Sequence, residues 1–101
     1  MEKMEEKKEE DNDFVLVGSK DFIQYIRSID LLMKKKNKKK IVLKARGKNM
    51  GKAIDLAEAS KNKFLKEMNL SIENIKTDTE SFEKDGEKRF VSCISIDLVR
   101  K

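Results

Sequence analysis

The fold of this chain is constrained most by two short, largely apolar runs. Each run ends at a glycine and is followed by apolar residues at helical spacing. The first run occupies residues 14–17 before Gly18, and the second occupies residues 41–46 before Gly47. Short apolar runs bounded by glycine are typical of buried β-strands. Apolar side chains that then recur every three or four positions predict amphipathic helices. These patterns predict the order strand, helix, strand, helix.

The helix ends are predicted from capping and charge. The first helix is expected to run to about residue 34, with Ser19 as its N-cap. Asp21 falls in the expected first turn, where the helix dipole favours an acid. Apolar spacing predicts a second helix over roughly residues 49–68.

Two aromatic residues, Tyr25 and Phe64, lie on these predicted helices. Aromatic side chains that stack on nucleic-acid bases normally project from exposed sheet faces or loops. We therefore expect both rings to pack in the core or in a subunit interface. The low aromatic content of 6% also argues against a protein that recognises single strands by stacking.

The C-terminal part of the chain has the pattern of a β-hairpin. Residues 70–82 are strand-like, with an expected bulge or irregular start. Asp85-Gly86 is a strong signal for a two-residue hairpin turn. In residues 90–98, alternate positions beginning at Phe90 give a strand with one apolar face. Cys93 falls on this strand and is expected to be an ordinary sheet residue.

The full order is therefore β-α-β-α-β-β. A strand–helix–strand unit places its strands parallel with a right-handed crossover. The order predicts an α+β fold, a two-layer sandwich with two helices on one face of a four-stranded mixed sheet. The 101 residues suffice for one domain. We expect that domain to occupy residues 14–101, and residues 1–13 to form a disordered acidic tail.

Charge is unevenly distributed along the chain. Residues 1–13 carry three lysines and seven carboxylates, a net charge of −4, whereas the whole chain carries +5, which leaves +9 for residues 14–101. A small body with this charge has a polyanion as its natural partner. Ordinary lysine-rich solubility is the alternative.

The composition also excludes most catalytic sites. The chain has no histidine and one cysteine, which removes the commonest general base, the usual triads, an internal disulfide and an ordinary zinc site. Residues 47–53 resemble a P-loop, but the spacing is one residue short and Ala53 replaces the metal-binding hydroxyl. We expect no enzyme activity, metal or cofactor; a lone-lysine lyase or nuclease is the remaining enzyme alternative.

Basic residues follow both predicted parallel strands, whose carboxyl ends share one edge of the sheet. Gly47, at the start of the second helix, adds backbone N–H groups that suit a phosphate. Arginine grips phosphate through two N–H groups, whereas lysine acts as a point charge. The sequence therefore predicts a backbone-binding site here, with a solvated basic rim as the alternative. Its residues are Lys20, Lys44, Arg46 and Lys48, with Lys52 of second rank.

Two further basic groups lie outside this edge. Lys84, Lys88 and Arg89 on the predicted hairpin are interleaved with acids, which suits either an arm along a nucleic-acid groove or a solvated turn. Residues 34–40 hold six lysines in seven positions and are expected at the opposite end of the sheet. This run is a solvated loop, a second contact or a nuclear-targeting cluster.

Short segments spread over residues 14–101 match a known family. The most specific is Lys44-Ala45-Arg46-Gly47 between a strand and a helix. The others are Val15–Lys20 followed by Tyr25, Ile41–Leu43, Lys52–Asp55, Asn62–Leu65, Val91-Ser92 with Ile94 and Ile96, and Arg100-Lys101. On these segments the chain resembles the Alba proteins of archaea and their eukaryotic relatives.

The resemblance implies a fold like that of the C-terminal domain of translation initiation factor three. It implies a homodimer, or a heterodimer with an Alba-like paralogue, whose hairpins extend as arms. It also implies sequence-tolerant binding to DNA, RNA or both, in chromatin organisation or translational regulation. In the family, two lysines after the first strand contact nucleic acid; here those positions are Ser19 and Lys20. A protein subunit of a ribonuclease P or MRP particle is the alternative.

The sequence also bears on location. No apolar run approaches the roughly 20 residues of a membrane span, and the first residues lack the apolar segment of a signal peptide. We expect the protein inside the cell, in the nucleus, the cytoplasm or both, and on chromatin if the source is archaeal. No membrane partner is expected.

Overall fold

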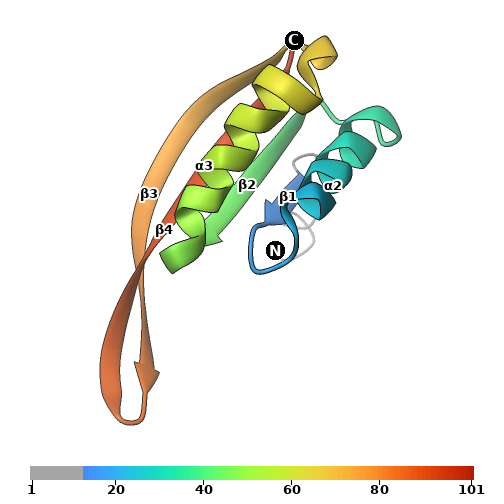
Figure 1. Cartoon of the computed structure of the whole chain (residues 1–101). Coiled ribbons are helices and arrows are strands. Elements are labelled where there is room, and N and C mark those ends of the chain that lie inside the picture. The colour runs from blue at the N-terminus through green and yellow to red at the C-terminus, as the bar shows by residue number, and fades with distance from the viewer. Residues whose placement is uncertain (1–12) are drawn as a thin grey trace.

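The computed structural model describes residues 13–101, which form four strands and two α-helices with short 3-10 and π-helical turns (Figure 1). The predicted order β-α-β-α-β-β is confirmed. The elements are β1 (Asp13–Leu16), α2 (Phe22–Lys34), β2 (Lys40–Arg46), η1 (Gly47–Asn49), α3 (Met50–Ala59), η2 (Ser60–Phe64), η3 (Lys66–Met68), β3 (Leu70–Lys84) and β4 (Glu87–Arg100).

The strands form one mixed sheet in the order β1-β2-β4-β3. β1 and β2 are parallel, whereas β2 and β3 both run antiparallel to β4. Val15, Leu43 and Ile96 are neighbours across three of the strands and are all buried, because alternate side chains of each strand face the helices. α2 and α3 cover that face (Figure 1), so the predicted two-layer α+β sandwich is confirmed.

The aromatic residues on the helices differ in their positions. Tyr25 is buried in the core, as predicted. Phe64 is 39% exposed, so the prediction of a core position was wrong for it. The π-helical turn η2 explains the error, because its wider winding rotates Phe64 away from the apolar stripe of α3. An interface position for Phe64 stays a prediction.

The helix boundaries also correct the sequence analysis. α2 begins at Phe22, and Asp21, not Ser19, holds the N-cap position, without a side-chain cap. Asp21 itself has extended backbone angles, and the N–H groups of Gly18 and Lys20 before it bond to the Tyr25 hydroxyl, as described below. The predicted helix over residues 49–68 is interrupted, because Leu65 leaves the helical region with φ −128° and ψ 32°.

The hairpin is longer than predicted. β3 and β4 pair from Leu70↔Arg100 to Lys84↔Glu87, and a register shift between Glu73 and Lys76 confirms the expected bulge. Asp85 and Gly86 both have positive φ, 54° and 77°, as the predicted tight turn requires.

The outer part of the hairpin, residues 79–92, extends beyond the body, and we call it the arm (Figure 1). Phe90 was predicted on the apolar face of its strand, but it is 67% exposed because neither helix covers the arm. Ile94, Ile96 and Leu98, further along β4, are buried as that pattern predicted.

The N-terminal boundary needs a small correction. Residues 1–12 of the predicted acidic tail lie outside the described residues. Asp13, predicted as the last residue of that tail, is the first residue of β1 and pairs with Ile41. Over residues 13–101, no helix is both long and apolar enough to cross a membrane.

Candidate nucleic-acid interface

The loops that follow β1 and β2 lie at the same end of the sheet, because these strands are parallel with Leu16 opposite Lys44. We call this end the strand-end edge, residues 17–20 and 46–49. The side chains of Lys20, Arg46 and Lys48 are exposed there, and Lys44 is exposed just before it. The structure thus brings four of the predicted residues to one end of the molecule.

The first loop of the strand-end edge is held by a buried tyrosine. The Tyr25 hydroxyl accepts hydrogen bonds from the backbone N–H groups of Gly18, at 2.7 Å, and Lys20, at 3.2 Å. Tyr25 comes from the first turns of α2 and is almost fully buried. One side chain therefore satisfies two backbone donors that belong to no strand or helix.

The same loop is held from the other side by α3. The Lys52 ammonium donates to the backbone carbonyls of Gly18, at 2.8 Å, and Lys20. Lys52 Nζ also lies 5.1 Å from the centre of the Tyr25 ring, within range of a cation–π contact. We call Tyr25 and Lys52 the clamp. Its effect is to fix the backbone that carries the exposed Lys20 side chain.

The clamp changes the role expected for Lys52. The sequence analysis predicted a second-rank phosphate contact, but the structure directs this ammonium onto carbonyl oxygens of the protein. Hydrogen bonds from a charged donor are among the stronger ones, so a phosphate has to compete with them. Lys52 is therefore better placed to position Lys20 than to bind phosphate itself.

Lys44 and Arg46 lie on the sheet face away from the helices, because they alternate with the buried residues Leu43 and Ala45. Lys44 Nζ lies 4.2 Å from the centre of the Phe14 ring. This contact leaves the ammonium at the surface, where it is able to approach a phosphate.

Arg46 has an acidic partner that the sequence analysis missed. Its Nη1 lies 2.7 Å from Oε1 of Glu80 on the arm, and both side chains are more than half exposed. The two residues border an open groove of about 610 Å³ on the helix-free face, which Lys76 and Cys93 also line. A phosphate at Arg46 would have to replace this carboxylate.

The Cys93 thiol in that groove has a raised pKa. Burial is the main cause, and the nearby Glu80 carboxylate adds to it. A raised pKa keeps the thiol protonated and a poor nucleophile. This environment agrees with the predicted role of Cys93 as an ordinary residue of the sheet.

The second loop of the strand-end edge turns at Gly47, whose φ is +59°. A Cβ at this position would meet Cγ2 of Val91 at 3.4 Å and would strain the left-handed backbone. Gly47 begins the 3-10 turn η1, which precedes α3, and Asn49 gives α3 no side-chain cap. A phosphate at these backbone N–H groups stays a prediction.

The hairpin residues lie apart from the strand-end edge. Lys84, Lys88 and Arg89 are exposed at the end of the arm (Figure 1). Arg89 lies 3.6 Å from Glu87, and Lys88 is opposite Glu83 in the hairpin register. The structure keeps the predicted interleaving of bases and acids and does not bring these three residues to the edge.

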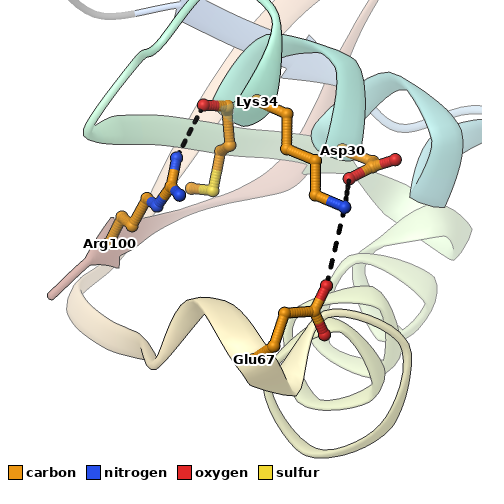
Figure 2. Close-up of polar contacts among 5 residues, drawn as sticks. Asp30, Lys34, Glu67 and Arg100 are labelled. Atoms are coloured by element: carbon orange, nitrogen blue, oxygen red, sulfur yellow. Dashed lines mark hydrogen bonds and ion pairs between the residues drawn. The ribbon is translucent and has the colours of Figure 1, made fainter.

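The lysine run of residues 34–40 lies at the opposite end of the sheet, because Lys40 begins β2 and Arg46 ends it. Six residues of extended strand separate the two ends by about 20 Å. Arg100 Nη1 donates to the Met33 carbonyl at 2.8 Å beside this run (Figure 2). The predicted placement of the run is thus observed.

Sequence reasoning missed the clamp and the acid that faces Arg46. Lys52 stands four positions before the buried Leu56, so it lies at the border of the apolar stripe of α3. That position was the one indication in the sequence that its side chain turns inward. Glu80 had no such sign, since its approach to Arg46 depends on the register of the bulged β3 strand.

Comparisons with known proteins agree with this fold. The family model described as Alba matches residues 13–79. A protein of Picrophilus torridus named DNA/RNA-binding protein Alba is 36% identical over 86 residues, which cover 85% of this chain and 93% of the relative. A protein of Thermoplasma acidophilum with the same name is 34% identical over 90 residues, 89% of this chain and 98% of the relative.

Two solved structures extend the comparison. Alba from Thermoplasma volcanium superposes with a TM-score of 0.76 at 34% identity, covering 87% of this chain and 100% of that one. An Alba protein of Trypanosoma brucei superposes with a TM-score of 0.67 at 18% identity, covering 87% and 68%, which shows a shared fold. The resemblance noted in the sequence is confirmed.

Proposed function

The chain belongs to the Alba family, and on that premise we propose that it is a non-catalytic protein that binds DNA and RNA through the phosphate backbone. Such binding depends little on nucleotide sequence, because phosphates are the same at every position. The relatives carry the name DNA/RNA-binding protein Alba, which favours this function over the ribonuclease P or MRP subunit. Chromatin organisation and RNA regulation are the roles that such binding serves.

The observation that carries the proposal is the fixed convergence of cations at the strand-end edge. Lys20 and Lys48 come from loops 28 positions apart in the sequence, and both are exposed. Within residues 13–101, neither ammonium has a carboxylate partner. The clamp fixes the backbone at Lys20, so less conformational entropy is lost when a phosphate binds there.

The remaining predicted residues take graded roles in this proposal. Lys44 and Arg46 extend the edge onto the helix-free face, with Arg46 available once Glu80 is displaced. Lys52 contributes indirectly, by fixing the backbone that carries Lys20. The arm residues Lys84, Lys88 and Arg89 make outer contacts along the polymer, since the arm extends beyond the body (Figure 1).

We further propose that the protein acts as a dimer inside the cell. Large apolar side chains are exposed on the arm and on α3, notably Phe82, Phe90 and Ile54. A domain of this size buries a modest share of its surface alone, so a partner that covers these side chains would add stability. A second copy or an Alba-like paralogue would fit this role.

Binding is tested by fluorescence anisotropy of one labelled DNA duplex and one matched RNA across a salt series. Backbone binding predicts that the logarithm of affinity falls with the logarithm of salt, by about 0.9 per phosphate contact on duplex DNA. The variant Lys20→Gln/Lys48→Gln should lower that slope by about two, on the same counterion-release argument. Arg27→Gln, an exposed change in the middle of α2, should leave the slope almost unchanged and serves as the control.

Failure to bind either polymer at low salt would contradict the proposal. A salt-independent affinity would contradict binding through the phosphate backbone, and an equal loss in the Arg27→Gln control would contradict the assignment of the site. The ratio of DNA to RNA affinity names the preferred partner.

A further inference from the structure

The loop between α2 and β2, residues 35–39, lies at the end of the sheet opposite the strand-end edge. We call it the lysine loop. Its backbone is tied to the last turn of α2, because the N–H groups of Lys35 and Lys36 both bond to the Leu31 carbonyl, at 2.9 and 3.3 Å. The N–H of Lys38 bonds to the Leu32 carbonyl at 3.1 Å. The run of lysines is therefore attached to a defined backbone.

The acids nearest the start of this loop already have other partners. Lys34, the last residue of α2, lies 3.5 Å from Asp30 and 3.7 Å from Glu67 (Figure 2). Arg100 donates to the Met33 carbonyl in the same view, which satisfies an acceptor at the helix end. Two carboxylates are thus directed to Lys34, which precedes the lysine loop.

The acids beyond the loop are engaged in the same way. Lys40, the first residue of β2, lies 3.9 Å from Asp97, and Lys101 lies 3.0 Å from Glu73. These ion pairs flank the lysine loop without including it. Within residues 13–101, the four carboxylates of these ion pairs therefore contact cations outside the loop.

Lys35, Lys36 and Lys39 remain as exposed cations. Among the contacts of residues 13–101, none of these three ammonium groups forms an ion pair. The C-terminal end of α2 offsets about half a charge through its dipole, which leaves most of the three charges uncompensated. Asn37, with φ +54°, turns the backbone between Lys36 and Lys39.

We propose that the lysine loop is a second surface that binds nucleic-acid phosphates, separate from the strand-end edge. The identity of the polyanion rests on the proposed function. The two surfaces lie about 20 Å apart along β2. That separation exceeds two Debye lengths at physiological salt, so each surface attracts phosphate through its own local field.

The separation leads to a quantitative test. Substitutions at sites this far apart, with no shared partner, should change the free energy of binding additively. The experiment compares four full-length proteins in the duplex anisotropy assay across a salt series: the parent, Lys20→Gln/Lys48→Gln, Lys35→Gln/Lys36→Gln/Lys39→Gln, and the combined variant.

The variant with Lys35, Lys36 and Lys39 replaced, the loop variant, is expected to lower the salt slope by about one to three, according to how many of these lysines contact phosphate. The corresponding loss of affinity at 0.1 M salt is roughly eightfold to 500-fold. The three loop substitutions should weaken binding by the same factor when they are added to Lys20→Gln/Lys48→Gln, the edge variant. Exchanging the three lysines for arginine keeps the charge and should keep the slope. Arg27→Gln removes one exposed charge elsewhere and should change affinity much less.

Several results would overturn the inference. If the loop variant binds like the parent while the edge variant is weakened, the second surface is wrong and the proposed function stands. If Arg27→Gln loses as much affinity per charge removed as the loop variant, net charge alone is responsible and the surface is also wrong. If the parent binds no nucleic acid, both proposals fail. Thermal unfolding of each variant confirms that it is folded.

Discussion

The two basic ends of the molecule each use a cation from a distant element to hold backbone carbonyls. At the strand-end edge, Lys52 of α3 donates to Gly18 and Lys20. At the lysine loop, Arg100 of β4 donates to Met33 (Figure 2). At the edge, the Tyr25 hydroxyl also accepts two N–H groups of the same loop, whereas N–H groups of the lysine loop bond to carbonyls of the adjoining helix end.

This difference separates two ways of presenting positive charge. The edge presents fewer cations, gathered from distant parts of the sequence and attached to a loop fixed on two sides. The lysine loop presents more cations, which are close together in the sequence and flanked by ion pairs. Each edge lysine should therefore contribute more to affinity than each loop lysine, since less of its binding energy is lost in ordering the chain.

The largest expected effect on stability is that of Lys52→Met, which removes the charged half of the clamp. Loss of two hydrogen bonds from a charged donor should lower the free energy of unfolding by about 2 kcal/mol, measured by urea denaturation. Affinity should fall as well, because Lys20 loses its fixed backbone. Lys48→Gln is the matched control and should reduce affinity with little change in stability. A Lys52→Met protein of unchanged stability would contradict the role of Lys52 in the clamp.

Tyr25→Phe removes only the hydroxyl of the clamp and keeps the buried ring. Two backbone N–H groups, of Gly18 and Lys20, lose their acceptor, so the free energy of unfolding should fall by about 1–2 kcal/mol. Hydrogen exchange at these two amides should accelerate. Unchanged exchange at both amides would show that the hydroxyl does not hold the loop.

Arg100→Met tests the corresponding contact at the other end. The aliphatic stem is largely kept while the hydrogen bond to the Met33 carbonyl is lost, which should lower stability by about 1 kcal/mol. The amides of Lys35, Lys36 and Lys38 should exchange faster, whereas those of Gly18 and Lys20 should not. Equally faster exchange of the amides at both ends would contradict the view that the two loops are held independently.

These contacts mark the limit of prediction from the sequence. Local patterns were sufficient for the element order, the turn at Asp85-Gly86 and the bulged start of β3, because each depends on residues close together in the chain. The end of α3 was missed, since the π-helical turn at residues 60–64 leaves the apolar spacing of the sequence unchanged. The exposure of Phe90 was missed because the alternating pattern continues past the end of the covered sheet.

The site was predictable only in part for the same reason. Parallel strand ends place Lys20, Lys44, Arg46 and Lys48 at one end of the sheet, and the topology alone implies this. Which cations are engaged depends on contacts between residues 32 to 34 positions apart, such as Lys52 with Gly18 and Lys20 or Arg46 with Glu80. No local pattern encodes these contacts.

Glu80→Gln should strengthen binding, since it releases Arg46 from a competing carboxylate. An exposed ion pair contributes at most about 1 kcal/mol, so the gain in duplex affinity should not exceed roughly fivefold at low salt. The gain should diminish as salt screens the pair. Asp78→Asn, a neighbouring carboxylate without a bond to Arg46, is the control. Weaker binding of Glu80→Gln would mean that the ion pair organises the site.

The smallest effect concerns pH at the lysine-loop end. The hydrogen bond with Lys101, and next that with Ser71, hold the pKa of Glu73 below its ordinary value of 4.5. A lowered folded-state pKa stabilises the protein above pH 4.5, and this contribution is lost as pH falls through the folded value. Glu73→Gln should therefore melt below the parent at neutral pH and approach it under acid conditions. A constant difference in melting temperature would contradict this.

Backbone amide NMR during titration with a short DNA duplex determines whether the strand-end edge contacts nucleic acid. If the edge binds the duplex, we expect early, saturable shifts at the amides of Ser19, Lys20, Gly47 and Lys48 in the parent protein. In Lys20→Gln/Lys48→Gln those shifts should require much more duplex. Shifts that arise only elsewhere, with these four amides unmoved at saturation, would show that the edge is not the binding surface.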